Sequence, residues 1–276
     1  MTFPDADRTP SGANSLTAQP GNHFPAAHAA ERVVLCMKWG VKYDAGYVNR
    51  LYAMASRNLS RPFRFVCLTD DAVGVRTEVE CRPIPAVPLP NPRMERRRKV
   101  ERIWEKIGLF QPELLSELGK SILFLDLDVV ILGSLDALFG QPGDFLIIRD
   151  WHNPFATIGN SSVFRFQADR HEGIYEYFCR SGDAVARRFH NEQEFLTRYM
   201  RGRGLLKFWP RAWCRSFRYH SVPSWPMSLW RMPSMPPGCR VLIFQGYPKP
   251  PDAILGRGHH WKKLQPSPWI AEHWIE

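Results

Sequence analysis

The sequence has no paired cysteine motif and no long apolar run. Its six cysteines form no C-x-x-C pair, and Cys36 and Cys67 lie in apolar segments where a free thiol packs as a small hydrophobic group. This usage predicts a reduced, cytoplasmic protein without structural zinc. The longest apolar stretches are interrupted by Asp or Arg well short of a membrane span, and the N-terminus lacks the order of a signal peptide. Any membrane contact is therefore expected to be peripheral, at the inner face.

Composition limits the class of protein and of partner. The 276 residues are 44% hydrophobic and 13% aromatic, which is enough for one large α/β domain with a sizeable core. The formal net charge of +10 suits a phosphate-rich or anionic partner. We expect no nucleic-acid partner, because the sequence contains no recognition-helix pattern, zinc finger or RNA-binding aromatic signature.

Apolar strand-like runs and helical periodicities alternate along the chain. Residues 1–31 have no apolar period and are predicted to be a disordered leader. Apolar residues at helical spacing follow the first run, between Val48 and Leu59, and a helix or helix pair is expected over 94–118. Strands are expected over 33–37, 63–68, 75–81, 123–130 and 145–149. The alternation predicts an α/β fold with a mainly parallel mixed sheet flanked by helices.

The C-terminal part has a different character. A short capped helix is expected over 134–139 and a helical pattern over 172–200. Beyond residue 205 the pattern becomes irregular, rich in Pro, and contains seven of the ten tryptophans. We predict a single domain over 32–250, with 251–276 as a tail that packs on it.

Two acids one residue apart are the most informative local pattern. Asp126 and Asp128 follow the apolar run 122–125. Because a β-strand sends alternate side chains to one face, both carboxylates are expected to emerge together. Hard oxygen ligands suit Mg²⁺ or Mn²⁺, whose shell is usually completed by phosphate oxygens of a nucleotide. The pattern predicts a metal-bound diphosphate, although a bare D-x-D also fits two solvated acids at a strand end.

Several segments in this order resemble GT-A-fold glycosyltransferases, especially the glycogenin-like and galactosyltransferase-like retaining family, commonly called family 8. The resemblance covers roughly residues 33–250 and centres on an apolar strand that ends L-D-x-D-V-V. Lys38-Trp39-Gly40 and Thr69-Asp70-Asp71 precede it, and the G-x-x-K-P segment 246–250 follows. The resemblance implies a metal-dependent enzyme that moves a hexose from a nucleoside-diphosphate sugar, a UDP-sugar in the family, to a hydroxyl acceptor with retained anomeric configuration. The acceptor could be a glycan, a lipid-linked sugar or a small molecule.

The resemblance also implies roles for individual residues. Mn²⁺ or Mg²⁺ would be held by Asp126, Asp128 and, at the position where the family has a histidine, Gln245. Water, His259 and His260 are alternatives for the third ligand, and a neutral oxygen there favours Mg²⁺ or a weaker site. The implied donor-binding residues are Lys38, Trp39, Tyr43, Thr69, Asp70, Asp71, Lys106, Asn160, Ser161, Gly246 and Lys249. The implied catalytic residues are Asp150, Gln193 and Glu192, where Glu192 replaces an aspartate of the family.

Purely structural roles remain open for many of these residues. Trp39 and Tyr43 could pack at the start of a helix, and Thr69 to Asp71 could cap a turn. Lys106 could be a solvated helix lysine, and Glu192 with Gln193 an exposed helix turn.

Two further segments are candidates for contact with an acceptor or a membrane. Six basic residues between the Pro-rich stretch and the D-x-D motif form either a solvated face or a patch for an anionic acceptor or an acidic bilayer: Arg93, Arg96, Arg97, Arg98, Lys99 and Arg102. The Pro-rich stretch 223–237 contains Trp225 and Trp230 and is the best candidate for an acceptor loop, because tryptophan faces suit sugar rings.

Three other functions are weighed against the transferase. Haloacid-dehalogenase-type phosphatases also carry a D-x-D after an apolar strand, but near the start of their core and followed by a pair such as Gly-Thr, where this chain has Val129-Val130. A sugar-nucleotide pyrophosphorylase would need a Gly-rich phosphate loop after the first strand, which we do not find. The missing histidine also leaves open a non-catalytic protein that binds nucleotide sugars or carbohydrate.

Overall fold

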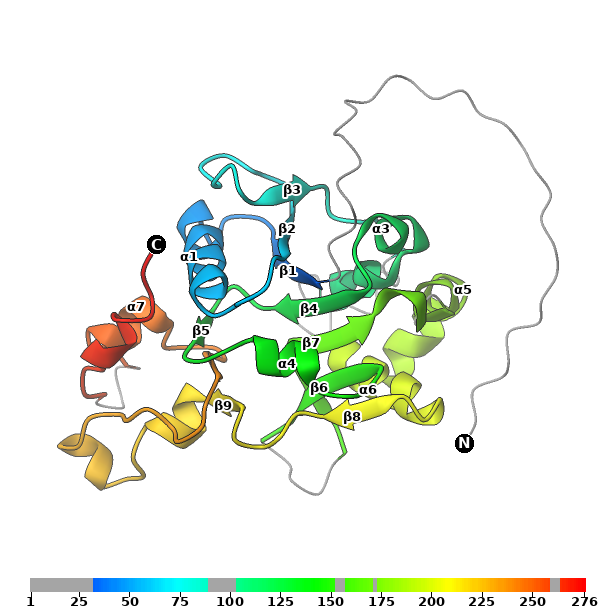
Figure 1. Ribbon diagram of the computed structural model, residues 1–276. Coiled ribbons are helices and arrows are strands. Elements are labelled where there is room, and N and C mark those ends of the chain that lie inside the picture. The colour runs from blue at the N-terminus through cyan, green and yellow to red at the C-terminus, as the bar shows by residue number, and fades with distance from the viewer. Residues whose placement is uncertain (1–31, 89–102, 152–156, 171–172, 259–263) are drawn as a thin grey trace, which may run out of the picture.

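The computed structural model describes residues 32–88, 103–151, 157–170, 173–258 and 264–276 (Figure 1). The predicted leader, the basic cluster from Arg93 to Arg102, and His259 and His260 lie outside these residues. No helix among the described residues has the length and apolarity needed to cross a bilayer.

A seven-stranded mixed sheet forms the centre of the molecule. Its order is β3-β2-β1-β4-β7-β6-β8, in which β7 runs antiparallel to both β4 and β6 and the other pairs are parallel. The strands are β1 (Arg32–Lys38), β2 (Arg64–Thr69), β3 (Glu80–Arg82), β4 (Ser121–Leu125), β6 (Phe145–Arg149), β7 (Gly159–Gln167) and β8 (Leu206–Phe208). The predicted α/β class and mainly parallel mixed sheet are confirmed.

Helices cover both faces of this sheet because its central strands are apolar on both sides. Along β1, Val34 and Cys36 point into one core with helix α1 (Ala45–Arg57), whereas Val33 and Leu35 point into the other. The second core is covered by η1 (Ile103–Phe110), α3 (Pro112–Glu117), α5 (Gly173–Arg188) and α6 (Glu192–Gly202). Figure 1 shows α1 on one side of the sheet and α5 and α6 on the other.

The D-x-D motif lies between two sheets and not within one strand. The chain leaves β4 at Leu125, turns through 126–128 and enters β5 (Val129–Ile131). That strand belongs to a three-stranded sheet of order β5-β10-β9, with β9 (Cys214–Ser216) and β10 (Val241–Ile243). The prediction of one continuous strand over 123–130 is therefore wrong. Its cause is the backbone pairing, since Asp126 N donates to Ser162 O at 2.9 Å and Phe244 N donates to Asp128 O at 3.3 Å.

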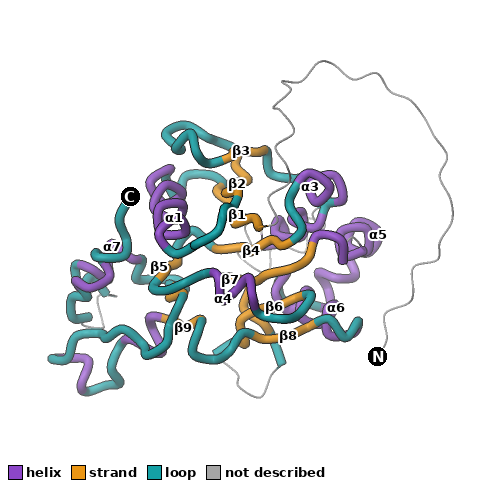
Figure 2. The backbone as a smooth tube through the Cα atoms, in the orientation of Figure 1, coloured by secondary structure: helices purple, strands orange, loops and turns teal. Residues whose placement is uncertain are grey.

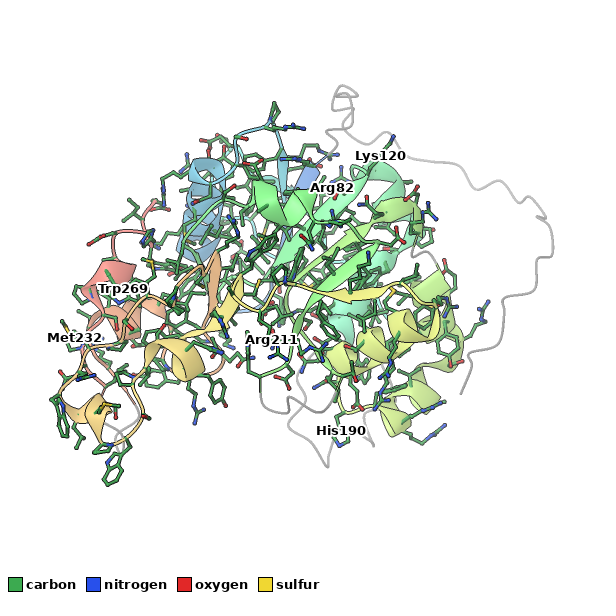
Figure 3. The ribbon with its side chains drawn as sticks, turned by 60° about the horizontal axis from the view of Figure 1, so that its bottom comes forward. Arg82, Lys120, His190, Arg211, Met232 and Trp269 are labelled. Atoms are coloured by element: carbon green, nitrogen blue, oxygen red, sulfur yellow. The ribbon has the colours of Figure 1, made fainter. Side chains whose placement is uncertain are left out.

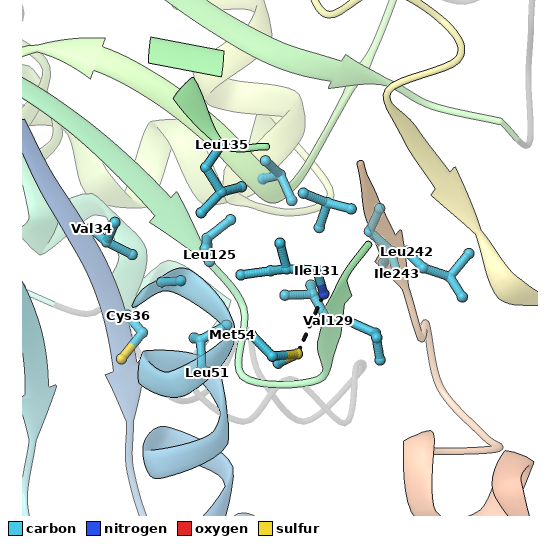
Figure 4. Packing of buried hydrophobic residues seen from close by; sticks show 14 of the residues in the cluster. Val34, Cys36, Leu51, Met54, Leu125, Val129, Ile131, Leu135, Leu242 and Ile243 are labelled. Carbon is cyan, nitrogen blue, oxygen red and sulfur yellow. Dashed lines mark hydrogen bonds between the residues drawn. The ribbon is translucent and has the colours of Figure 1, made fainter. Parts of the chain in front are cut away.

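A buried apolar cluster packs at both ends of this turn (Figure 4). Leu125 at the end of β4 and Val129 at the start of β5 are both fully buried, so the turn is anchored at each end. Met54 of α1 contributes its sulfur, 3.4 Å from the Ile131 backbone nitrogen. Because packed cores resist movement of their residues, the two acids between these anchors are held in a defined position.

The C-terminal region is mostly loop in the tube view (Figure 2). Its short elements are the π-helix η3 (Phe217–Ser221), the 3₁₀ helices η4 (Met227–Leu229) and η5 (Pro268–Ile270), and α7 (Pro250–Ile254). Ala253, Ile270 and Trp274 are buried in the same core as α1. Arg57 also binds the carbonyls of His273 and Ile275, each at 3.0 Å.

Several element boundaries differ from the expectation. The third strand begins at Glu80, because a turn and a bend occupy 77–79. The described part of 94–118 is a 3₁₀ helix and then a short α-helix, separated at Gln111 because Pro112 begins the second. The short helix expected over 134–139 is α4 (Asp136–Gly140), but its N-cap is Leu135, whose side chain makes no capping hydrogen bond. The helical pattern over 172–200 divides into α5 and α6, where the side chain of Asn191 accepts a hydrogen bond from Glu194 N as an N-cap.

Candidate active site

A cavity of about 320 Å³ lies beside the D-x-D turn. Its size is in the range of small-molecule sites. It is formed where the ends of β1, β4 and β10 meet the loop before α1, η1 and the start of α6. Nine predicted site residues line it: Trp39, Tyr43, Lys106, Asp126, Asp128, Glu192, Gln245, Gly246 and Lys249.

Both D-x-D carboxylates face this cavity and both are paired with lysines. Lys106 Nζ lies 2.7 Å from Asp126 Oδ1. Lys249 Nζ binds Asp128 Oδ2, and the Tyr43 hydroxyl donates to the same oxygen at 2.8 Å. Among the described residues, none donates a hydrogen bond to Asp126 Oδ2 or Asp128 Oδ1. Each carboxylate therefore keeps one oxygen for another ligand.

Lys106 connects Asp126 to Glu192. Its ammonium also donates to Ser161 O at 3.1 Å, and the Ser161 hydroxyl donates to Glu192 Oε1 at 2.7 Å. Burial by itself lowers the pKa of Lys106, but the negative charges of Asp126 and Glu192 outweigh it and the pKa is raised. Burial raises the pKa of Glu192, and the nearby Lys106 charge only partly offsets this effect. Lys106 is therefore a buried cation between two acids and not a solvated helix lysine.

Tyr43 and Lys249 hold Asp128 from two separate segments. Lys249 also donates to Phe244 O at 3.2 Å, and it precedes α7, whose first residue is Pro250. Burial, followed by the adjacent Asp128 charge, raises the pKa of Tyr43, so the hydroxyl keeps its proton as a donor. Gly246, between Phe244 and Lys249, has a φ of 68°, a conformation that favours glycine. The G-x-x-K-P segment can therefore bend back towards the acids.

The residues present fit a hard divalent cation. Gln245 Oε1 is buried in the cavity lining and has no hydrogen-bond partner among the described residues. A buried polar atom without a partner is costly, and a ligand or metal ion at that point would satisfy it. Together with Asp126 Oδ2 and Asp128 Oδ1 it makes an all-oxygen donor set of the kind that Mg²⁺ and Mn²⁺ take. The described residues contain no group of three or more His, Cys, Asp and Glu suited to a metal, so Gln245 is the candidate for a third donor among them.

Four of the predicted donor-binding residues do not line the cavity and instead join the ends of β1 and β2. Lys38 is buried and donates to Asp71 O at 2.9 Å. The Thr69 hydroxyl donates to the same carbonyl at 2.8 Å, and Gly40 N donates to Asp70 Oδ2 at 2.9 Å. These contacts match the capping role that the sequence left open for Thr69, Asp70 and Asp71.

Four other predicted residues lie behind or away from the cavity wall. Asn160 and Ser161 are buried in β7, and Gln193 Oε1 accepts from Ser161 N at 3.3 Å. Asp150 follows β6 and donates its backbone N–H to Ile158 O at 3.0 Å. Of the three residues proposed as catalytic, only Glu192 lines the cavity.

Five lining residues were not predicted: Met37, Lys42, Leu127, Ser162 and Phe244. Lys42 is the most informative of them, because it is exposed and has no acid within ion-pair distance among the described residues. Its ammonium lies 5.0 Å from the centre of the Tyr43 ring. The sequence signal that could have indicated Lys42 is a second lysine four residues after Lys38, just beyond the first strand.

No protein-family model and no curated protein matches the chain in sequence. Solved structures do match it. The galactosyltransferase LgtC, in complex with donor and acceptor sugar analogs, is 14% identical, with a TM-score of 0.53 over 79% of this chain and 88% of that chain. The glycosyltransferase GlyE of Streptococcus pneumoniae TIGR4 is 10% identical, with a TM-score of 0.56 over 89% of this chain and 61% of that chain. The bifunctional glycosyltransferase WbbM is 12% identical, with a TM-score of 0.51 over 83% of this chain and 48% of that chain. The chain therefore has the fold of these glycosyltransferases, which confirms the predicted GT-A-like fold.

Proposed function

We propose that this protein is a metal-dependent glycosyltransferase that moves a hexose from a nucleoside-diphosphate sugar, a UDP-sugar by resemblance, to a hydroxyl acceptor with retention of configuration. The observation that carries the proposal is the cavity in which Asp126, Asp128 and Gln245 offer oxygen donors beside lysine ammonium groups. This combination of cations and an oxygen-held metal suits a diphosphate. The glycosyltransferases with the same fold, one of them solved with donor and acceptor sugar analogs, support it.

Mg²⁺ or Mn²⁺ would be held by Asp126 Oδ2, Asp128 Oδ1 and Gln245 Oε1. When bound, the ion supplies positive charge that neutralises the departing diphosphate. Lys249 and Lys42 line the same cavity and would bind phosphate oxygens directly. Their charges stabilise the diphosphate more as the glycosidic bond breaks, because its negative charge grows at that point.

The remaining cavity residues would orient the two ends of the donor. Trp39 and Tyr43 line the cavity, and their rings would provide apolar surface for a base and ribose. Glu192 faces the cavity beyond Lys106, and its carboxylate would accept from a sugar hydroxyl. Gln193 holds Ser161 N and would act by positioning that strand. The acceptor would be a glycan, a lipid-linked sugar or a small molecule that carries a free hydroxyl.

Calorimetry with a panel of nucleotide sugars, each with and without Mn²⁺ or Mg²⁺, tests the proposal together with a transfer assay. We expect metal-dependent binding of one donor, and we expect Asp126→Asn to lose that dependence and to lower transfer about a hundredfold or more. Asp169→Asn is the matched control, because Asp169 is exposed and lies outside the cavity lining.

The possible failures of this experiment have different meanings. Normal metal-dependent turnover by Asp126→Asn refutes the assigned role of the D-x-D acids. Phosphate release from sugar phosphates, without sugar transfer, would indicate the phosphatase. Tight donor binding without turnover or hydrolysis would indicate a non-catalytic binding protein.

A further inference from the structure

The chain between β9 and β10 makes a long excursion, residues 217–240, whose apolar side chains are exposed. Of the eleven exposed large hydrophobic residues in the described chain, seven lie here: Tyr219, Trp225, Met227, Leu229, Trp230, Met232 and Met235. Trp225 is 78% exposed and Trp230 is 63% exposed. The surfaces of soluble monomeric proteins rarely expose so many large apolar side chains in one short segment, and such apolar patches mark interaction sites.

The excursion is a built structure and not a loose loop. Ser234 N donates to Ser221 O at 3.1 Å, which closes its base. The indole of Trp269 donates to Pro233 O at 3.0 Å, and Ser228 is buried within the short helix η4. Figure 3 shows Met232 at the outer edge of the molecule, with Trp269 on its inner side. These contacts fix the backbone of the excursion, and its large apolar side chains remain exposed.

The charged residues of the excursion and of its flanking segments in the chain have one sign. Residues 195–251 contain ten Lys or Arg and no Asp or Glu. Arg218 and Arg231 lie in the excursion itself, and Arg211, Arg215 and Arg240 flank it. A segment with only positive charge attracts an anionic partner and repels a basic one.

We propose that the excursion 217–240 docks the protein on the surface of an anionic lipid bilayer. Trp225, Trp230 and Met232 would enter the interface between head groups and acyl chains, where indole rings are favoured. Arg218 and Arg231 would bind the acidic head groups. A second copy of the chain is a poorer occupant, because a symmetric contact would place the same cations against each other. The docking surface lies outside the lining of the cavity and does not depend on the reaction performed there.

Vesicle co-sedimentation with the full chain tests this inference. We expect binding to vesicles in which about a quarter of the lipid is phosphatidylglycerol, and weak binding to phosphatidylcholine alone, because the bilayer charge attracts the arginines. Arg218→Ser with Arg231→Ser should lower affinity for the anionic vesicles about 25-fold, since each charge near acidic lipid contributes about fivefold. Trp225→Ser with Trp230→Ser should lower it about tenfold or more, from the loss of buried apolar surface.

Val73→Ser is the matched control, because Val73 is 82% exposed but lies in the loop after β2. Its vesicle affinity should equal that of the wild type, and nucleotide-sugar binding should be unchanged in every variant. Three results would overturn the proposal. The first is vesicle binding that survives both double substitutions, because another basic segment would then be responsible for it. The second is that the substitutions abolish self-association of the protein and have no effect on lipid binding. The third is that they raise the KM for the acceptor while the wild type binds no vesicles.

Discussion

Lys106→Met tests whether the charges in the cavity hold one another in place. Methionine is similar in length to lysine but has no ammonium group. The substitution therefore removes the hydrogen bonds from Lys106 Nζ to Asp126 Oδ1, at 2.7 Å, and to Ser161 O, at 3.1 Å. The Lys106 side chain is 12% exposed and that of Asp126 is 27% exposed. Breaking a buried pair costs about 3–5 kcal/mol, and we expect the lower end, about 3 kcal/mol, because Asp126 is partly solvated. For a chain of this size that corresponds to a fall in Tm of about 6–12 °C.

The same substitution has a pH dependence of predictable sign. Burial raises the pKa of Glu192, and the Lys106 charge lowers it in part, so removing Lys106 raises it further. A carboxyl group whose pKa is raised by folding destabilises the folded state as pH increases above the pKa of the unfolded chain. The deficit of the variant should therefore be largest near about pH 8 and smaller near about pH 5, where Glu192 takes up a proton on folding.

Urea unfolding at the two pH values, followed by tryptophan fluorescence, measures both effects. Lys207→Met is the control, because Lys207 is exposed and its Nζ contacts only the Pro142 carbonyl, at 3.3 Å, among the described residues. Its free energy of unfolding should change by less than about 0.5 kcal/mol. A deficit for Lys106→Met below about 1 kcal/mol, or one that is equal at both pH values, would refute the account of Lys106 as a buried cation between two acids.

Two further substitutions separate binding from stability. Lys42→Met should weaken nucleoside-diphosphate binding about tenfold in calorimetry, because a charged hydrogen bond is lost, while Tm is unchanged; a lower Tm at unaltered affinity would contradict the assignment of Lys42 to the ligand. Gly246→Ala places a side chain at a φ of 68°, where an added Cβ meets no atom within 4 Å, so only backbone strain of about 1–2 kcal/mol is expected. A thermal scan that finds no loss would show that this turn relaxes freely.

The fold was largely predictable because its strong signals are local. Runs such as 33–37 and 122–125 are continuously apolar, and a strand that is buried on both faces of a sheet requires such a run. Alternation of these runs with helical periodicity was enough to predict the mixed, mainly parallel sheet. Boundaries were less accurate where turns and proline decide them, as at Glu80 and Pro112.

The composition of the site was predictable only in part. Lys38 and Lys42 are four residues apart, and nothing local indicates which ammonium faces the cavity. Pairing of β1 with β2 brings Lys38 to Asp71, whereas the loop before α1 leaves Lys42 at the cavity. Strand β7 likewise presents Ser162 and keeps Asn160 and Ser161 behind it.

The sequence by itself determined the α/β class, the position of the two acids after an apolar strand, and the lysine of the G-x-x-K-P segment near the end of the domain. Only the tertiary structure decided that Asp126 is paired with Lys106 and Asp128 with Lys249. The residues of the second pair are 121 positions apart in the chain. The tertiary structure also decided that the two acids lie in a turn between sheets and that Gln245 keeps an oxygen without a partner among the described residues. The physical reason is that a strand buried on both faces must be continuously apolar, and this pattern can be read from residues that are adjacent in the sequence. Which charges meet depends on how distant segments pack, and sequence spacing contains no record of that.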